Sequence, residues 1–328
     1  MTTASAIAHP NIAFIKYWGN RDDVLRLPAN GSISMNLDGL ETRTSAEFDP
    51  QRGEDDFTLQ GVVQTGTTAE RVSDHLNLLR NLAGVAWKAR IVSENNFPIG
   101  AGIASSASAF AALTVAAAAA LGLELAEREL SILARRGSGS ASRSVPEGFV
   151  EWFVANRDED SFAVSIAPPS HWPLIDVIAI VNAGPKKVGS AEGNVLARTS
   201  PLQAARVADA PRRLDLCRRA ILEKDFTALA EIVEEDTRLV HAVMMTSRPS
   251  LTYWEPETLE LMRLIPEWRA GGLPVAYTVD AGPNVHCLSL EESAEEVERR
   301  LRELPAVRHI LRARPGPGAK VVPLKPKD

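Results

Sequence analysis

One stretch of the sequence constrains the fold more than any other: residues 103–123 contain no charged side chain. A segment of this length is long enough to span a membrane. It is mostly Ala, Ser and Gly, however, and it lies between Glu94 and Glu124 with no cluster of Lys or Arg nearby. We therefore predict a helix buried in a soluble protein, and a membrane span is the minor alternative.

Composition places the chain among ordinary globular proteins. The 328 residues suit one large domain or, more comfortably, two. A hydrophobic fraction of 45% and a charged fraction of 24% argue against disorder, collagen-like repeats and coiled coils. The net charge of −6 gives no overall basic field for nucleic acid, so anion binding must rely on local charge.

The cysteines and the N-terminus indicate the compartment. Cys217 and Cys287 are too few for a disulfide framework, and neither lies in a CxxC motif. The N-terminal residues show no basic segment followed by a long apolar core, so they make a poor signal peptide. We expect a reducing cytoplasm. The six His are scattered, and no His/Cys cluster indicates a permanent metal site.

Hydrophobic periodicity predicts a mixture of strands and helices. A shift toward Ala, Leu, Arg and Glu near 184–200 predicts two domains, 1–184 and 185–328. The Pro/Gly/Lys-rich tail is given no element. The expected strands lie in 5–48, at 86–95, at 175–184 and on both sides of a turn in 274–290; the expected helices lie at 68–83, 103–123, 126–136, within 200–245, at 255–270 and at 292–304.

A glycine- and serine-rich segment, 95–108, follows a strand and opens the uncharged helix. Small residues let a phosphate approach the backbone, and helix N-terminal N–H groups favour an anion. Ser105, Ser106 and Ser108 add hydroxyls for phosphate oxygens or Mg²⁺. The segment is neither GxxxxGK[ST] nor GxGxxG. From the residues alone, phosphate binding and tight helix packing are equally good interpretations.

Four motifs together carry a family resemblance. They are IAFIKYWGNRD, PIGAGIASSASAFAAL, GSGSASRS and VDAGPNV, in this order over residues 7 to about 290. The set resembles the mevalonate diphosphate decarboxylase family of the GHMP kinase superfamily. That resemblance implies an α+β, two-domain fold of the GHMP kinase type with the active-site cleft between the domains. It also implies ATP with Mg²⁺, a phosphorylated mevalonate substrate and a homodimer.

The resemblance also assigns roles to individual residues. Asp280 would face the C3 hydroxyl of the mevalonate skeleton, although alone it is better interpreted as a turn residue. Arg143 would hold the substrate carboxylate, whereas alone it reads as a solvated arginine. Lys16 is a plausible extra cation or a solvated lysine. The implied substrate pocket comprises Tyr17, Trp18, Gly19, Asn20, Arg71, Ser138, Gly139, Ser140, Ser190 and Ala191; the implied nucleotide site comprises Ser93, Asn95, Asn96, Gly100, Gly102, Ala104, Ser105, Ser106 and Ser108.

The chain departs from the family pattern where the substrate phosphate would bind. Asn20 replaces a lysine of the KYWGK motif, and Ala191 replaces an arginine or threonine and is followed by Glu192. Arg71 is retained. Two missing charged hydrogen bonds would cost about 3–6 kcal/mol, or about 10²–10⁴ in affinity. The first expectation is therefore decarboxylation of mevalonate 5-phosphate to isopentenyl phosphate.

Three alternatives remain at this stage. A diphosphomevalonate decarboxylase would need compensating contacts, for which Lys186 and Lys187 are candidates. A mevalonate-type kinase would use the same phosphate segment without releasing CO₂. A non-catalytic binding protein would need no such set of hydroxyls, arginine and aspartate.

Two further positions depart from the family pattern. Val145, Pro146 and Gly148 stand where the family tends to have a Tyr-Gly-Gly-like stretch, and Ser142 stands where it usually has Cys. These changes could alter the wall of the substrate pocket.

Overall fold

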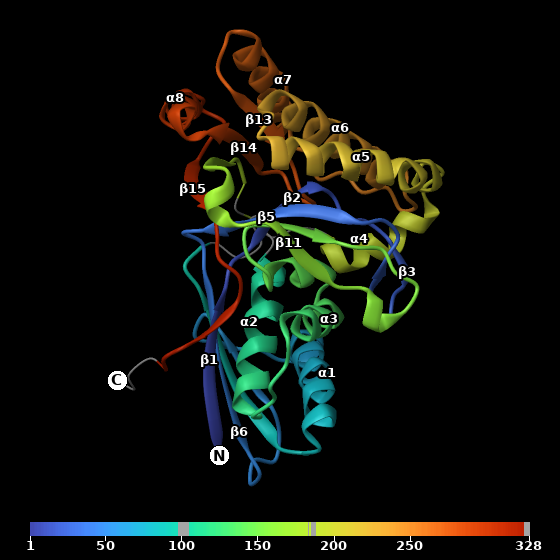
Figure 1. Ribbon diagram of the computed structural model, residues 1–328, viewed down its shortest axis with the longest axis vertical. Coiled ribbons are helices and arrows are strands. Elements are labelled where there is room, and N and C mark those ends of the chain that lie inside the picture. Colours follow the sequence, from blue (N-terminus) through green and yellow to red (C-terminus); the bar gives the residue numbers. More distant parts are fainter. Residues whose placement is uncertain (98–104, 183, 185–187, 325–328) are drawn as a thin grey trace.

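A computed structural model describes residues 1–97, 105–182, 184 and 188–324. Its first layer is a six-stranded sheet in the order β16-β1-β6-β9-β7-β8 (Figure 1), in which only β7 and β9 pair in parallel. In β6, buried and half-buried residues alternate, as expected where one face of a strand packs on a core. The strands of this sheet are β1 (Thr2–Ala8), β6 (Thr42–Asp49), β7 (Asp56–Leu59), β8 (Val62–Val63), β9 (Lys88–Asn95) and β16 (Lys320–Val322).

Three helices pack beside this sheet, and the uncharged one is central. Helix α2 (Ser105–Ala120) contacts β1 and β6, and most of its alanine side chains are fully buried. The small side chains allow this close approach to the sheet. Helix α1 (Gly66–Ala83) and helix α3 (Glu127–Gly137) flank it. The prediction of a buried helix over 103–123 is confirmed for Ser105–Ala120, and the helix ends before residues 121–123.

A second sheet joins the two halves of the chain. Its order is β11-β10-β5-β15-β12-β14-β13, and β2 also pairs with β5. The sheet mixes early and late strands, and β12 precedes the expected domain boundary at 184 yet pairs with β14 and β15. The division at 184 therefore stays a prediction. The strands are β2 (Asn11–Ile15), β5 (Ser32–Asp38), β10 (Phe149–Trp152), β11 (Ala163–Ala167), β12 (Leu174–Ile180), β13 (Val275–Thr278), β14 (Val285–Leu290) and β15 (His309–Pro315).

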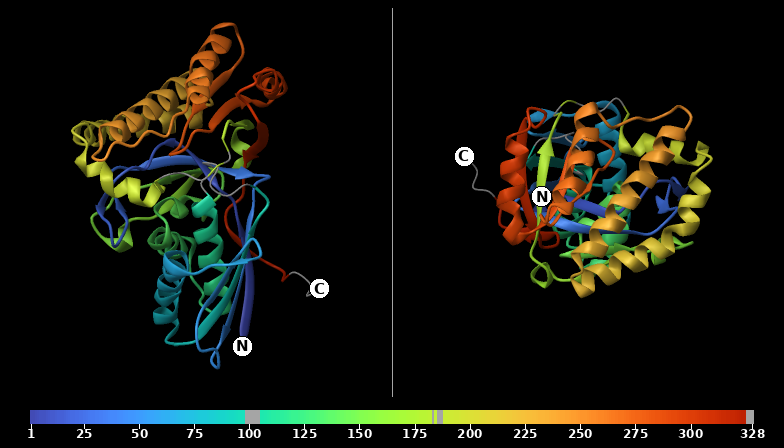
Figure 2. Two further views of the ribbon diagram at one scale, coloured as in Figure 1. Left: turned by 180° about the vertical axis from the view of Figure 1, so that it is seen from behind. Right: turned by 90° about the horizontal axis from the view of Figure 1, so that it is seen from above.

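Helices α5 to α8 cover the side of this second sheet opposite α1–α3, as Figure 2 shows. In α8, Ala294, Val297 and Leu301 form one buried apolar stripe at helical spacing. A small hairpin, β3 (Asn20–Asp22) with β4 (Leu27–Pro28), lies near α4. The later helices are α4 (Ser190–Leu196), α5 (Gln203–Glu223), α6 (Phe226–Thr246), α7 (Pro256–Ala270) and α8 (Ala294–Arg302); short 3₁₀ helices include η1 (Gly139–Ser144).

The predicted elements are present, but the prediction did not include β7, β8, β10, β11, α4 and the strands of the tail. The expected helices over 68–83, 126–136, 255–270 and 292–304 correspond to α1, α3, α7 and α8. The tail was given no element, but it contains β15 and β16. β15 pairs with β12 and β5, and β16 pairs with β1, so tertiary pairing rather than local pattern orders these residues. Within the described residues, no helix has the length and apolar character needed to cross a membrane.

Candidate active site

A cavity of about 380 Å³ lies where segments far apart in the sequence meet. They include the end of β2 with the turn after it, the starts of α2 and α4, the junction of α3 and η1, and residues 279–281 after β13. Most of the expected substrate and catalytic residues lie in its wall. Those that line it are Tyr17, Trp18, Arg71, Ser138, Gly139, Ser140, Arg143, Ser190, Ala191 and Asp280.

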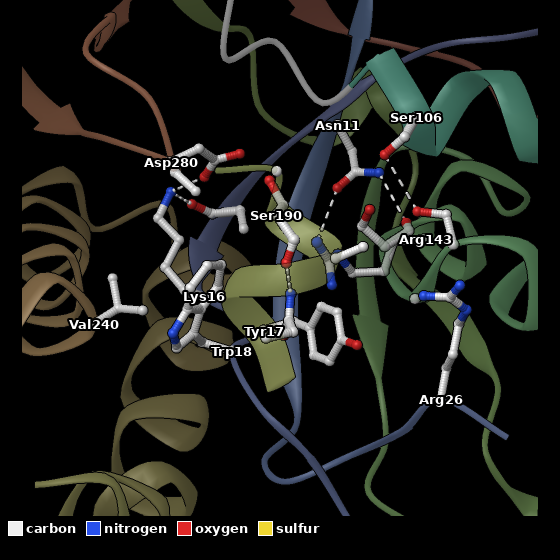
Figure 3. A pocket seen from close by; sticks show the side chains of 18 of the residues that line it. Asn11, Lys16, Tyr17, Trp18, Arg26, Ser106, Arg143, Ser190, Val240 and Asp280 are labelled. Atoms are coloured by element: carbon white, nitrogen blue, oxygen red, sulfur yellow. Dashed lines mark hydrogen bonds and ion pairs between the residues drawn. The ribbon is translucent and has the colours of Figure 1, made fainter. Parts of the chain in front are cut away.

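Asp280 lies where β13 ends in a turn, and its side chain is paired with a lysine (Figure 3). Lys16 Nζ lies 2.5 Å from Asp280 Oδ1 and donates a second hydrogen bond to Ala13 O at 2.6 Å. Lys16 is almost completely buried, so it is not a solvated surface lysine. Sequence reasoning left Lys16 undecided, because its partner lies in a distant segment.

Arg143 is buried in the opposite part of the cavity wall. Its guanidinium donates to Ser34 Oγ at 3.0 Å, to Ser32 Oγ at 2.5 Å and to Asn11 Oδ1 at 3.1 Å. Burial lowers the pKa of Arg143 to about 10, while the charge of Asp280 acts in the other direction. Arg143 thus stays cationic at neutral pH. Its three acceptors are uncharged, so its charge is available to an anion in the cavity.

Sequence reasoning missed Asn11, which orients Arg143. The Asn11 side chain also donates to Ser144 Oγ at 2.8 Å and to Ser140 O at 3.2 Å. One strand residue therefore connects β2, Arg143 and the 3₁₀ helix η1. Its position on a buried strand gave no sequence signal beyond an amide within an apolar run.

Tyr17 stands between the two parts of the cavity. Its ring packs against Trp152 with centroids 4.8 Å apart, and burial raises its pKa to about 12. The phenol therefore stays protonated and donates to Asn20 Oδ1. The Asn20 amide in turn donates to Asp23 at 3.0 Å, so the side chain is directed to its own hairpin. Asn20 is not among the residues that line the cavity.

Gly19 likewise supports the wall rather than forming it. Its φ of +93° lies in the left-handed region, and a Cβ there would come within 2.4 Å of Gln203 Nε2. Its amide donates to Asn194 Oδ1 at 2.8 Å, which fixes the turn against α4. This turn places Tyr17 and Trp18 in the cavity.

A second cavity of about 340 Å³ has the expected features of a nucleotide site. Apolar side chains such as Phe57, Leu59 and Phe110 offer a surface for a base, and Ser105 and Ser106 lie at the start of α2. Arg71, Ser105 and Ser106 line both cavities, so the two sites adjoin.

The expected nucleotide residues divide into three groups. Ser93 and Asn95 line the second cavity. Asn96 and Ser108 do not: Asn96 bonds to Gly39 and Glu41, and buried Ser108 bonds to Thr42 Oγ1 at 2.6 Å. The remaining predicted residues, Gly100, Gly102 and Ala104, lie outside the described residues, as do Lys186 and Lys187.

Two family models match the chain. The first, a diphosphomevalonate decarboxylase-like N-terminal domain, matches residues 8–163, and the second, a mevalonate 5-diphosphate decarboxylase C-terminal domain, matches residues 176–314. The chain belongs to the diphosphomevalonate decarboxylase family. The expected family and the expected mixed α and β fold of the GHMP kinase type are thereby confirmed.

Named relatives of this family are similar over most of the chain. The diphosphomevalonate decarboxylase of Aspergillus fumigatus is 40% identical over 316 residues, covering 90% of this chain and 78% of the relative. That of Saccharomyces cerevisiae is 39% identical over 317 residues, covering 90% and 80%. These relatives favour the diphosphate alternative over the monophosphate expectation.

Solved structures of the family share the whole fold. The mevalonate diphosphate decarboxylase of Enterococcus faecalis has a TM-score of 0.92 and 38% identity, with 98% of this chain and 99% of that chain covered. The Staphylococcus aureus enzyme has a TM-score of 0.91 and 37% identity, with 98% of each chain covered. Another structure with a TM-score of 0.92 is a complex with MVAPP, AMPPCP and magnesium.

Proposed function

We propose that this protein converts diphosphomevalonate and ATP to isopentenyl diphosphate, ADP, phosphate and CO₂. The observation that carries the proposal is the arrangement of one cavity: the Lys16–Asp280 pair stands on one side and the buried, cationic Arg143 on the other. The adjoining second cavity and the membership of the family support the same reaction.

The first step needs a tertiary hydroxyl to attack a phosphoryl group. Asp280 would accept the proton of the C3 hydroxyl as its oxygen forms the new bond to phosphorus. Lys16, 2.5 Å from Asp280, holds the carboxylate in place and keeps positive charge beside the reacting oxygen. ADP is the leaving group of this step.

The second step breaks two bonds. The C1–C2 bond breaks to release CO₂, its electron pair forms the C2=C3 double bond, and phosphate leaves C3 with the C–O electrons. Arg143 would orient the carboxylate, because Ser32, Ser34 and Asn11 fix its guanidinium plane. A planar guanidinium in a fixed position holds the carboxylate in one orientation. It therefore also orients the C1–C2 bond that breaks.

ATP and Mg²⁺ fit the residues present. The second cavity combines an apolar wall with Ser93 and Asn95, and Ser105 and Ser106 give hydroxyls at a helix N-terminus. Mg²⁺ in such enzymes is bound largely by nucleotide phosphates and water, with few protein ligands. Together they supply the phosphoryl group and neutralise its developing charge.

A second candidate substrate, mevalonate 5-phosphate, is favoured by Asn20 and Ala191. Asn20 stands in place of a lysine and Ala191 in place of an arginine or threonine, so both positions lack an expected contact to a diphosphate. Against this, the cavity contains Arg26 as well as Arg71, which gives two guanidinium groups where sequence reasoning counted one. Calorimetric titration of the enzyme with each substrate, without nucleotide, compares them. Tighter binding of diphosphomevalonate supports the proposal, and tighter binding of the monophosphate favours the second candidate.

The proposed activity is tested by product stoichiometry. With ATP and diphosphomevalonate, the purified protein is expected to release ADP, phosphate and CO₂ in equal amounts. ADP formation without CO₂ would instead indicate a kinase and would overturn the proposal. A matched reaction without the mevalonate substrate measures background ATP hydrolysis.

The homodimer implied by the resemblance and the cytoplasmic location expected from the cysteines stay predictions. Both cysteines are buried and unpaired, which is compatible with a reducing compartment. Light scattering of the purified protein at several concentrations measures the mass, and a monomer throughout would contradict the homodimer.

A further inference from the structure

Two arginine side chains converge on the C-terminal end of α3. Arg71 donates to Gly137 O through Nε at 3.2 Å and Nη2 at 2.7 Å. Arg26 donates through Nε to the preceding carbonyl, Arg136 O, at 2.9 Å. The C-terminal end of a helix stabilises cations, so both anchors are electrostatically favourable. Both side chains line the cavity that contains Asp280 and Arg143.

These two cations are close enough to affect each other. Burial first, and then the like charge of Arg26, lower the pKa of Arg71 to about 10. Within the described residues, neither arginine forms an ion pair with a carboxylate, whereas the neighbouring Arg136 is paired with Asp158. Two partly buried, repelling guanidinium groups in one cavity wall are stabilised when an anion binds between them.

The backbone of Arg26 is unusual for an arginine. Its φ of +51° lies in the left-handed region, which costs about 1–2 kcal/mol for a residue with a Cβ. It lies in the turn between β3 and β4, and Figure 3 shows its guanidinium across the cavity from Asp280. The phosphate end of a mevalonate phosphate is the end away from the C3 hydroxyl, so Arg26 lies on the appropriate side.

We propose, building on the proposed function, that Arg26 binds the diphosphate of the substrate together with Arg71 and so replaces the phosphate contacts absent at Asn20 and Ala191. Arg26 is thus a specificity-determining residue supplied by the β3–β4 turn rather than by the KYWG segment. The observation behind this assignment is the shared anchoring of both arginines at adjacent carbonyls in the cavity wall.

The test compares Arg26→Gln with a matched control on the same hairpin. Glutamine can still donate to the Arg136 carbonyl, so the variant removes the charge while keeping the anchor. Arg21→Gln removes an equal charge from an exposed arginine that bonds to Asn156. Calorimetry with diphosphomevalonate alone measures binding, and steady-state kinetics measure kcat, the substrate KM and the ATP KM.

We expect Arg26→Gln to weaken diphosphomevalonate binding about 10- to 100-fold. The ATP KM and kcat should stay within threefold, because the residue contacts neither the nucleotide cavity nor Asp280. Arg26→Lys should recover part of the affinity, since it restores the charge without the planar fork. Arg21→Gln should bind as the wild type does.

Diphosphomevalonate binding within twofold of the wild type in a folded Arg26→Gln variant would overturn the assignment. So would an equal loss of ATP affinity, which would indicate a structural role. If glutamine prevents folding, Arg26→Lys decides: diphosphomevalonate binding weaker than that of the wild type, at an unchanged ATP KM, supports the assignment, and binding within twofold of the wild type contradicts it. Failure of the proposed function is a separate result: the wild-type enzyme would prefer mevalonate 5-phosphate. In that case the affinities of variant and wild type would be compared with mevalonate 5-phosphate as the ligand.

Discussion

Replacing Asp280 with asparagine removes one carboxylate charge and nearly preserves the side-chain shape. Asp280 Oδ1 lies 2.5 Å from Lys16 Nζ, which also donates to Ala13 O at 2.6 Å. The amide oxygen of asparagine can still accept from Lys16, so the cavity wall should keep its form. The perturbation is therefore confined to the charge and to the proton that Asp280 accepts.

The expected loss follows from the role of Asp280. A positioned general base contributes about 10²–10⁴-fold to the rate, or about 3–5 kcal/mol of activation free energy. Asp280→Asn should lower kcat by this factor. The phosphate and carboxylate of the substrate would still meet Arg71 and Arg143, which the change leaves in place. The dissociation constant of diphosphomevalonate should accordingly stay within a few-fold of the wild-type value.

The assay separates chemistry from binding. Single-turnover release of CO₂ gives the rate, calorimetry without nucleotide gives substrate affinity, and thermal unfolding checks the fold. Asp215→Asn, which removes an exposed carboxylate from α5, serves as the matched control. A variant at position 280 with kcat within tenfold of the wild type would refute the role of Asp280 as the base. A loss of affinity equal to the loss of rate would assign Asp280 to binding instead.

Arg143→Lys keeps the charge but cannot reproduce three fixed donors, so kcat/KM measured by CO₂ release should fall about 10- to 100-fold; an unchanged value would contradict the orienting role. Burial lowers the pKa of His241 to about 3, so the unfolded chain binds a proton that the native state does not. The free energy of unfolding should thus fall as pH drops below about 6.5, and protonation of His241 in the unfolded chain should lower it by about 2 kcal/mol at pH 5. Urea unfolding across pH measures this decrease. It should be smaller by that amount in His241→Gln and unchanged in a variant of an exposed histidine, His309→Gln.

Local patterns predicted the parts of the site that depend on short segments. The start of α2 with Ser105 and Ser106, and the turn that carries Asp280, depend on a few neighbouring residues whose types limit the backbone. Alone, Arg143 reads as a solvated arginine and Asp280 as a turn residue, and their roles in the site came from the family resemblance of the motifs that contain them.

Contacts between distant segments could not be predicted in this way. Lys16 and Asp280 are 264 residues apart, and Arg26 meets Arg136 across 110 residues. Sequence reasoning therefore counted charges within the KYWG segment and missed Arg26, whose role depends on how a hairpin packs against α3. β15 escaped prediction for the same reason, because its pairing with β12 orders a polar segment.

The most direct test of the central claim is the ratio of kcat/KM for diphosphomevalonate to that for mevalonate 5-phosphate, measured by CO₂ release at saturating ATP and Mg²⁺. Two guanidinium groups at the phosphate end should make this ratio about tenfold or more in favour of the diphosphate. A ratio of one or below would contradict the proposed substrate and would assign the enzyme to mevalonate 5-phosphate.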